Sequence, residues 1–383
     1  MTTSFDEDTN LLVQTVRQFA DERIRPIAAQ LDETERFPAE IYSELGSMGL
    51  LGITVPDEDF GTGGMCIDYV NVMEELSRGY ASVADQVGVV ELVGSLISAF
   101  GTPEQKQKYL PGLFAAELRC SYGLTEPSAG SDLGGLKTTA LRDGDSYLLN
   151  GEKIYIHNAP IADVVMVLAI TDKSKGKRGM SMFLVDVDTP GVERAYKEHK
   201  MGQRASPVGG FVFTNARIPA TALLGEEGSG FSAVLSGLEK GRLGIGALAS
   251  GISRAALETS IEHASMREQF GQRIADFQSV AFTLADMKVD YDAGRALLER
   301  AARLLDAKGA ANTACSVAKL FASEAAIRNT NRAVQVLGGT GYIRGVEAER
   351  LYRDARITTI YEGTSEVQRL VISRSLVGKS GSR

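Results

Sequence analysis

The sequence predicts an α+β fold built from three successive parts. These are an all-helical N-terminal domain over residues 1–118, an antiparallel β-barrel or sandwich domain over 119–228, and a C-terminal four-helix-bundle domain over 229–383. Apolar residues recur at helical spacing in the first and last parts, whereas glycine, proline and short β-branched runs dominate the middle. Strands and helices do not alternate, which argues against a doubly wound nucleotide-binding sheet. A length of 383 residues agrees with two or three domains.

The N-terminal part is predicted to be helical because its apolar side chains return every three or four residues. Leu12, Val16 and Phe19 form one such series. A helix start is expected near residue 102, since Thr102 can cap a helix, Pro103 suits its first position and Gln105 completes a capping box.

The middle part contains short β-branched and aromatic segments separated by turn residues, as in an antiparallel barrel or sandwich. The segments are 147–149, 164–170, 181–187 and 210–213. Asp143-Gly144 and Asn150-Gly151 are favourable turn dipeptides, so we expect a turn at each.

The C-terminal part returns to helical spacing after residue 230. The spacing continues to about residue 378, with short breaks near 272–275, 308–311 and 338–346. Long stretches rich in Ala and Leu, such as 276–307, indicate the antiparallel helices of a bundle. No short repeat is present, so a solenoid is not expected.

Composition and charge narrow the classes of function. Hydrophobic residues make up 44% and charged residues 23%, which is typical of a globular protein and excludes a disordered or fibrous chain. The net charge of −8 argues against a partner that is nucleic acid or an anionic membrane. The start MTTSFDEDTN is acidic and no apolar run reaches about 18 residues, so we expect neither a signal peptide nor a membrane span. A cytoplasmic protein is the expectation.

The cysteines and histidines give no indication of a metal site. Cys66, Cys120 and Cys315 are far apart and outside any CxxC motif. The three histidines lack the spacing of metal ligands.

Three segments combine glycine with polar residues and are candidates for ligand contacts. They are 123–135 (GLTEPSAGSDLGG), 335–342 (QVLGGTGY) and 361–365 (YEGTS). Small residues let backbone amides approach a ligand, and the hydroxyls of Thr125 and Ser131 add donors. Each segment alone also has an ordinary explanation: a surface loop, a helix end stopped by glycine, and a solvated glutamate.

Together these segments resemble the motifs of the acyl-CoA dehydrogenase family of flavoproteins, and the resemblance spans essentially the whole chain. Segment 123–135 matches the first family motif, and 335–354 matches the second, except that Gly345 stands where an acidic or amide residue is usual. Further matches are 150–153 (NGEK), 201–204 (MGQR), 267–271 (REQFG) and 361–365. The helical, β, helical order is also the architecture of that family.

The resemblance implies one FAD per subunit, held between the middle domain and the C-terminal helices. The matching cofactor residues of one subunit are Tyr122, Leu124, Thr125, Gly130, Ser131, Tyr155, Ile156, His157, Thr364 and Glu366. A second group matches residues that hold the adenosine half of FAD across a subunit interface: Arg267, Phe270, Gln278, Gln335, Gly338 and Gly339. A cofactor that spans an interface requires at least a dimer, and the family is usually tetrameric, so we expect a homo-oligomer.

One departure from the family concerns the flavin. The family most often has Trp-Ile-Thr, or a close variant, where this chain has Tyr155-Ile156-His157. Tyr155 can still stack on the ring, but His157 replaces a hydroxyl expected to hydrogen-bond near flavin N5. Either the histidine donates the same bond or adds positive charge there, or it only fills the site with one satisfied nitrogen.

The activity implied by the resemblance is α,β-dehydrogenation of a saturated acyl-CoA. The α-proton needs a base, which a carboxylate of raised pKa in an apolar pocket provides, and the β-hydrogen needs flavin N5 as hydride acceptor. Glu362 matches the family's base, and its backbone N–H together with a ribityl hydroxyl of FAD is implied to bind the enolate oxygen. Some family members carry the base on an early helix of the C-terminal domain, but Gly241 stands at that position here, and Glu239 competes only if the helix register differs.

The resemblance also implies a set of substrate contacts. They are Ser131, Leu238, Arg242, Tyr361, Glu362 and Gly363, with Arg242 supporting catalysis electrostatically or forming only a surface ion pair. The acyl pocket is expected between segment 82–100 and residues around 230–240, where Gly88 and Gly94 leave space for a substituent. Glu91 faces either this pocket or, by the ordinary behaviour of glutamate, solvent or a salt-bridge partner.

The expected electron acceptor is an electron-transfer flavoprotein. An alternative keeps the fold but reacts with oxygen, or uses the flavin site for a different elimination on a CoA thioester. A flavin-bearing family member that acts on nucleic acid is disfavoured by the net charge of −8 and by the lack of a long basic tail after Leu351.

Overall fold

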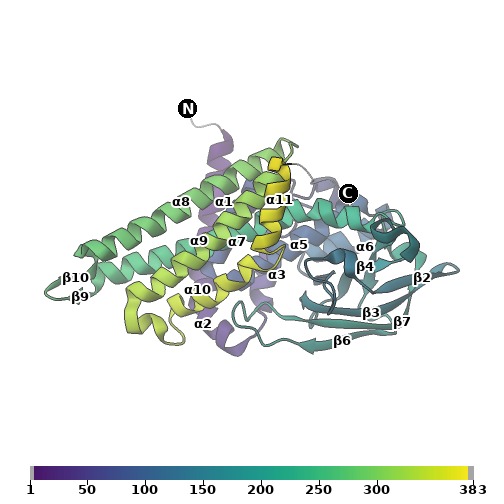
Figure 1. Cartoon of the computed structure of the whole chain (residues 1–383), viewed down its shortest axis with the longest axis horizontal. Helices are drawn as coiled ribbons and strands as arrows, with labels where there is room; N and C mark the ends of the chain where they lie inside the picture. Colours follow the sequence, from purple (N-terminus) through teal and green to yellow (C-terminus); the bar gives the residue numbers. More distant parts are fainter. Residues whose placement is uncertain (1–3, 378–383) are drawn as a thin grey trace.

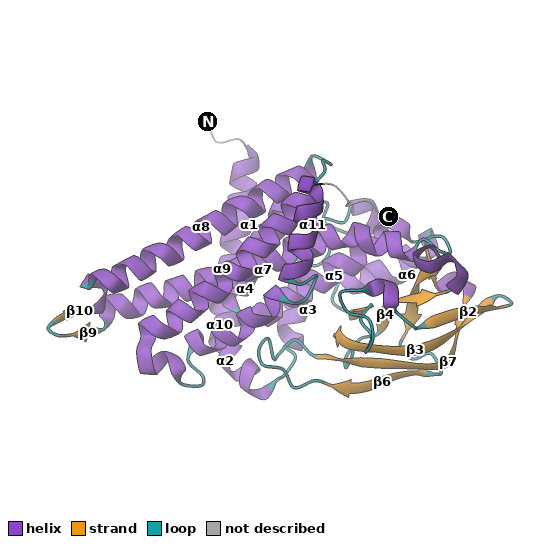
Figure 2. Ribbon diagram, in the orientation of Figure 1, coloured by secondary structure: helices purple, strands orange, loops and turns teal. Residues whose placement is uncertain are grey.

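The computed structural model describes residues 4–377 and has the predicted helical, β, helical order (Figure 1). The sheet lies at one end of an elongated body, and the long helices of the C-terminal part extend away from it (Figure 2). The predicted fold class is confirmed.

The N-terminal part consists of helices throughout. They are α1 (Ser4–Phe19), a π-helical turn (Ala20–Ile24), α2 (Arg25–Thr34), α3 (Ala39–Ser47), α4 (Cys66–Gly79), α5 (Ala81–Phe100) and α6 (Pro103–Phe114). The predicted start of α6 is confirmed: Gln105 N donates to Thr102 Oγ1 over 3.3 Å, and Thr102 N donates to Gln105 Oε1 over 3.0 Å.

Helix α5 is long and apolar enough to cross a membrane by length and composition alone, which the sequence reading did not anticipate. In this fold 67% of its most apolar window is buried inside the protein. The core of a folded protein therefore accounts for its composition.

The middle part is one eight-stranded sheet in the order β6-β7-β3-β2-β4-β5-β8, with β1 beside β4. The strands are β1 (Cys120–Gly123), β2 (Thr139–Asp143), β3 (Ser146–His157), β4 (Val164–Ile170), β5 (Met180–Asp186), β6 (Val192–Lys197), β7 (Val208–Pro219) and β8 (Leu223–Leu224). Most pairs are antiparallel, as expected, but β1 and β2 each pair with β4 in parallel.

One of the two predicted turns is wrong. A turn does connect β2 to β3 directly after Asp143, with Gly144 and Asp145 as its two central residues, because Asp143 pairs with Ser146. Asn150-Gly151 instead lies inside β3 at an irregularity between Leu149 and Gly151 in the pairing with β7. Gly151 has φ 145°, and a Cβ there would lie 2.4 Å from Thr138 Oγ1, so the glycine serves a bulge and a close approach to another segment.

The C-terminal part is a bundle whose long helices lie side by side (Figure 1). Its helices are α7 (Gly230–Met266), α8 (Gln278–Asp306), α9 (Asn312–Leu337), α10 (Glu347–Ala355) and α11 (Ser365–Val377). A hairpin of β9 (Glu268–Gln269) and β10 (Gln272–Arg273) joins α7 to α8. The three predicted breaks between helices are confirmed, but the break over residues 356–364, between α10 and α11, was not predicted.

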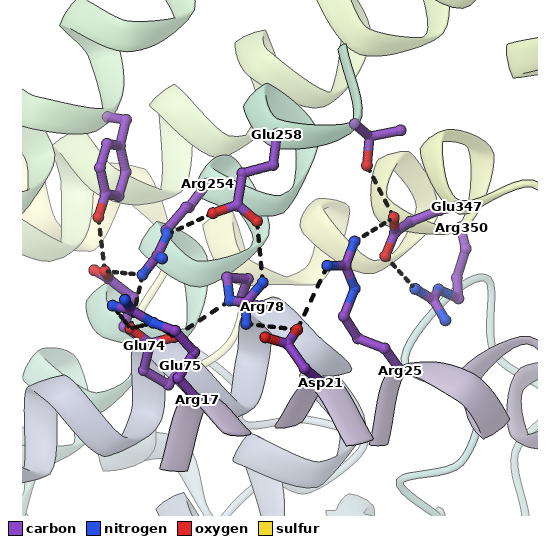
Figure 3. A network of polar contacts seen from close by, with 12 residues as sticks. Arg17, Asp21, Arg25, Glu74, Glu75, Arg78, Arg254, Glu258, Glu347 and Arg350 are labelled. Atoms are coloured by element: carbon purple, nitrogen blue, oxygen red, sulfur yellow. Dashed lines mark hydrogen bonds and ion pairs between the residues drawn. The ribbon is translucent and has the colours of Figure 1, made fainter. Parts of the chain in front are cut away.

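A network of ion pairs joins the N-terminal helices to the bundle (Figure 3). Arg78 on α4 contacts Asp21 at 2.7 Å, Glu75 at 3.2 Å and, on α7, Glu258 at 3.1 Å. Burial acts to raise the pKa of Glu75, but hydrogen bonds and charge from Arg17 and Arg254 lower it below the usual range. Because each buried charge has partners, the network fixes how α1 and α4 sit on α7.

Candidate active site

Glu362 lies in the short segment between α10 and α11, where the backbone turns sharply. Glu362 has φ 52° and Gly363 has φ 91°, two successive residues in the left-handed region. Two side chains hold this turn through the Gly363 carbonyl, to which Lys319 Nζ donates over 2.8 Å and Gln368 Nε2 over 2.9 Å. The turn directs the Glu362 side chain toward α7.

The carboxylate of Glu362 faces the predicted glycine on α7. A Cβ built at Gly241 would lie 2.5 Å from Glu362 Oε2, so Gly241 and not Glu239 stands opposite the carboxylate, and the helix register is the expected one. Oε2 is buried and has no hydrogen-bond partner among residues 4–377. Burial raises the pKa of Glu362, Lys319 and Arg242 act to lower it, and Asp85 raises it further. The ordinary expectation of a solvated loop glutamate is wrong here.

Two cations lie near this carboxylate without a direct ion pair to it. Lys319 on α9 is fully buried, and burial lowers its pKa to about 8 against the opposing charge of Glu362. Arg242 is also buried rather than part of a surface ion pair, and its Nη1 donates to Asn312 Oδ1 at 2.7 Å and Ser316 Oγ at 3.3 Å. Because their surroundings have a low dielectric constant, the positive charges of Lys319 and Arg242 interact strongly with Glu362. They stabilise the ionised form of its carboxylate.

The glycine-rich segment after β1 is anchored by a buried ion pair. Glu126 accepts from Lys153 Nζ at 2.8 Å and from the backbone N–H of Lys137 and Thr138. Burial lowers the pKa of Lys153 to about 8, while the Lys153 charge helps to lower the pKa of Glu126 despite its own burial. Lys153 ends the NGEK motif, yet sequence reasoning gave it no role.

The cofactor residues expected from one subunit come from β1, the end of β3 and the start of α11. Tyr122 Oη is buried without a hydrogen-bond partner within the described residues, Tyr155 is 65% exposed at φ 56°, and Ile156 is buried. Gly130 and Ser131 are exposed in the loop that follows β1. Thr364 and Glu366 line a cleft of about 430 Å³ to which Arg328 and Arg356 contribute guanidinium groups. The exposed Tyr155 ring offers a surface on which a flat aromatic group can stack, and the guanidinium groups of the cleft offer partners for an anion.

The second group of expected cofactor residues lies elsewhere in the same chain. Arg267, Phe270 and Gln278 lie at and beside the hairpin between α7 and α8, at the far end of the bundle from the sheet (Figure 1). Gln335, Gly338 and Gly339 lie at the end of α9. One chain therefore does not bring the two groups together.

His157 ends β3 and lies in a polar cluster that sequence reasoning missed. The His157 cluster comprises Asp85, Gln86, His157, Asn158 and Ser206. Asp85 and Gln86 come from α5, so their contact with β3 depends on tertiary packing and leaves no local signal in the sequence. Burial lowers the pKa of His157, the charge of Asp85 raises it, and Lys200 lowers it.

The segments expected to line the acyl pocket meet where one face of α7 packs against α4 and α5. A Cβ at Gly244 would lie 2.1 Å from Tyr69 Oη, and one at Gly88 would make ordinary contact with Met73. Gly94 does not leave space for a substituent, because a Cβ there would lie 2.7 Å from the Phe114 ring. That expectation is corrected: Gly94 serves the packing of α6 against α5.

Glu91 is fully buried and is held by three partners. Thr54 N donates to its Oε1 over 3.1 Å, Ser95 Oγ donates over 3.5 Å, and Lys240 Nζ lies 3.9 Å away. Of the three expectations for Glu91, the salt-bridge partner is confirmed and solvent exposure is wrong, while a place beside the acyl pocket stays a prediction. Lys240 precedes Gly241, so this charged pair stands one residue along α7 from the Glu362 contact.

Comparison with known proteins identifies the class of this enzyme. Models of the N-terminal, middle and C-terminal domains of acyl-CoA dehydrogenases match residues 6–117, 121–216 and 228–377. The chain belongs to the acyl-CoA dehydrogenase family, whose members are flavin-dependent oxidoreductases that act on CoA thioesters.

Individual relatives cover nearly the whole chain. The mitochondrial short-chain specific acyl-CoA dehydrogenase of Bos taurus is 44% identical over 97% of this chain and 90% of its own length. The caffeyl-CoA reductase–Etf complex subunit CarC of Acetobacterium woodii is 41% identical over 98% of this chain and 100% of its own. The structure of a glutaryl-CoA dehydrogenase from Mycobacterium smegmatis in complex with FADH2 is 35% identical, with a TM-score of 0.93 over 99% of this chain and 96% of that one.

Proposed function

We propose that this protein catalyses FAD-dependent α,β-dehydrogenation of a saturated acyl-CoA to the trans-2-enoyl-CoA, with Glu362 as the base for the α-proton. The observation that carries the proposal is the Glu362 carboxylate, whose Oε2 is buried against Gly241 without a hydrogen-bond partner in the described part of the chain. An ionised carboxylate in that setting is poorly solvated, so it accepts a proton readily.

Other residues of the chain position the base and keep it ionisable, whereas the hydride acceptor has to come from the cofactor. Lys319 and Gln368 hold the Glu362 turn in place, and Arg242 with Lys319 keeps the base ionisable. When bound, FAD supplies the acceptor for the β-hydrogen. Tyr122, Tyr155 and the loop of Gly130 and Ser131 are the residues we assign to hold it.

We assign a short acyl chain to the substrate. The buried Glu91 carboxylate, paired with Lys240, acts on Tyr69 through its charge. A long apolar chain that extended past Tyr69 would have to displace this buried charge and its partners. The short-chain specificity in the name of the Bos taurus relative supports this assignment.

We further propose an electron-transfer flavoprotein as electron acceptor, a cytoplasmic location and a homotetramer. The relative from A. woodii is named as a subunit of an Etf complex, which supports the first of these. The same name describes a reductase, so the reverse reaction on an enoyl-CoA is the second candidate function. Both directions use the same base and cofactor.

The experiment that tests the function is an anaerobic screen of CoA thioesters for bleaching of the oxidised flavin band. Saturated thioesters of short chain length are expected to bleach it, and the reduced flavin is expected to be reoxidised faster by electron-transfer flavoprotein than by air. Fast reoxidation by air alone favours an oxidase. Bleaching by no saturated thioester, with reoxidation of the reduced enzyme by an enoyl-CoA, favours the reductase.

Glu362→Gln tests the base. The amide keeps the volume and the backbone donor but accepts no proton, so flavin reduction by the best thioester is expected to slow by at least ~10³ in anaerobic stopped-flow experiments. FAD content and CoA-thioester binding must remain, and both are measured first. A variant that reduces flavin within tenfold of the parent removes Glu362 from the mechanism.

A further inference from the structure

Three polar atoms of the His157 cluster lie within hydrogen-bonding distance of one another. Ser206 Oγ lies 2.7 Å from both Asp85 Oδ2 and His157 Nε2, and these two atoms are 3.3 Å apart. Gln86 Nε2 lies 2.9 Å from the same ring nitrogen. Because Asp85 and Ser206 meet one nitrogen of the ring, the three residues do not form a nucleophilic triad, in which serine and carboxylate use opposite ring nitrogens.

The amide groups of the cluster fix the tautomer of His157. Asn158 Nδ2 faces the Cys120 carbonyl at 3.3 Å, so this atom is the donor and not the amide oxygen. It also donates to Gln86 Oε1 over 2.8 Å, which orients Gln86 so that its Nε2 donates to Asn158 Oδ1 over 3.0 Å. The second N–H of Gln86 is closer to His157 Nε2, at 2.9 Å, than to Ser206 Oγ, at 3.5 Å, so it donates to His157. His157 Nε2 is thus an acceptor, and a neutral ring carries its proton on Nδ1.

The Ser206 hydroxyl then has one proton, which it can donate either to Asp85 or to His157 but not to both. If Ser206 donates to Asp85, its oxygen faces the bare His157 Nε2, and if it donates to His157, its oxygen faces the bare Asp85 carboxylate. One additional proton on Asp85 Oδ2 removes the conflict, because Asp85 then donates to Ser206 and Ser206 donates to His157. The arrangement of these three residues therefore favours one proton more than is present when Asp85 is ionised and His157 is neutral.

We propose that Asp85, Ser206 and His157 form a one-proton relay beside the flavin, which takes up a proton from solvent when the cofactor is reduced. The inference rests on the FAD site of the proposed function, where His157 stands in place of a hydroxyl. The relay proton comes from bulk water and is additional to the α-proton held by Glu362 and the hydride taken by the cofactor. It offsets the negative charge that reduction adds beside the His157 ring.

The charged groups around the relay come from three parts of the chain. Asp85 lies on α5, Lys200 lies between β6 and β7, and Glu362 precedes α11. Lys200 opposes a positive charge on His157, and Asp85 favours one. The His157 side chain is 19% exposed and that of Asp85 12%, so the described part of the chain seals neither of them completely.

Proton uptake on photoreduction tests the relay without any acyl-CoA. The FAD holoprotein is photoreduced anaerobically in weak buffer with an indicator dye, across a range of pH, and protons taken up per flavin are counted. Within part of the pH range, the parent is expected to take up one more proton per flavin than the variants His157→Gln and Asp85→Asn. The control variant His263→Gln is expected to take up as many protons as the parent. Equal uptake by the parent and both cluster variants at every pH overturns the relay.

NMR of the imidazole nitrogens reports the tautomer of His157 directly and needs no substitution within the His157 cluster. The sequence has three histidines, so the spectrum of the holoprotein is readily assigned with His199→Gln and His263→Gln. In the oxidised holoprotein the His157 ring is expected as the Nδ1–H tautomer, and the Nε2–H tautomer overturns the relay. Flavin reduction by no thioester, with proton uptake as expected, would instead remove the proposed function and leave the relay.

Discussion

Among single residues, the contact between Gly241 and Glu362 has the most direct consequence. Because a Cβ at position 241 would lie 2.5 Å from Glu362 Oε2, Gly241→Ala must displace the Glu362 carboxylate, which is the proposed base. Flavin reduction by the best thioester is expected to slow by about 10²-fold, the order of loss for a misplaced catalytic group. Stopped-flow reduction at unchanged FAD content measures it.

The control for Gly241→Ala is Gly294→Ala on α8, where the nearest atom to an added Cβ is 3.6 Å away, and its rate is expected to match the parent. In the Glu362→Gln background, Gly241→Glu places a carboxylate at the same contact and should recover part of the activity. A Gly241→Ala enzyme of parental rate would mean that the base does not act from this position.

The site residues that could be predicted from the sequence are those that belong to a family motif. Glu362 and Gly241 were predicted from their places in the family pattern, and the structure puts them in contact. Lys319 and Asp85 were missed because each acts on the site across a large separation in sequence, from α9 and α5. A buried lysine within a helix gives no periodic signal that separates it from a surface one.

For helices and strands, the sequence predicted where an element begins or ends more accurately than irregularities inside it. The capping box at Thr102 and the turn at Asp143-Gly144 are set by nearby residues, so both predictions are confirmed. Asn150-Gly151 has the same turn chemistry, but the long pairing of β3 with β7 continues past it and makes it a bulge. The domain limits at residues 118 and 228 stay a prediction.

Helix α7 offers a test of close packing at the same scale. A Cβ at Gly251 would lie 2.3 Å from the Glu74 carbonyl of α4, which cannot move without shifting that helix. Gly251→Ala is therefore expected to lower the free energy of unfolding by about 1–3 kcal/mol despite the better helix propensity of alanine. Thermal and denaturant unfolding of the holoprotein measure it.

The matched variant is again Gly294→Ala, since an added Cβ there meets Phe321 and Ala322 at ordinary distances of 3.6–3.8 Å. It is expected to stabilise the protein by about 0.5–1 kcal/mol through helix propensity alone. Equal effects at the two positions would show that α4 and α7 do not pack as closely as this structure has them.

For the whole molecule, the placement of the cofactor residues argues for assembly. The second group of expected residues lies at the end of the bundle away from the sheet, so the proposed use of both groups on one FAD requires a second copy of the chain (Figure 1). Phe270 is 94% exposed at the tip of the β9–β10 hairpin, where it and Gly271 have φ of 52° and 80°. A two-residue turn of this kind holds the ring outward, and an aromatic ring held in water is unfavourable unless a partner covers it.

Phe270→Glu tests whether a second copy of the chain covers that ring and completes the FAD site. A charge at the hairpin tip is expected to produce smaller species in sedimentation velocity and to lower the ratio of flavin to protein, with an unchanged helical circular dichroism signal. Leu141→Glu is the control, because Leu141 is also an exposed apolar side chain, at 56%, but lies on β2 away from the second group. Its assembly and flavin content should equal those of the parent. A flavin-saturated monomer of the parent protein, or a Phe270→Glu variant with full FAD content, contradicts the assignment, because both require that one chain alone holds the whole cofactor.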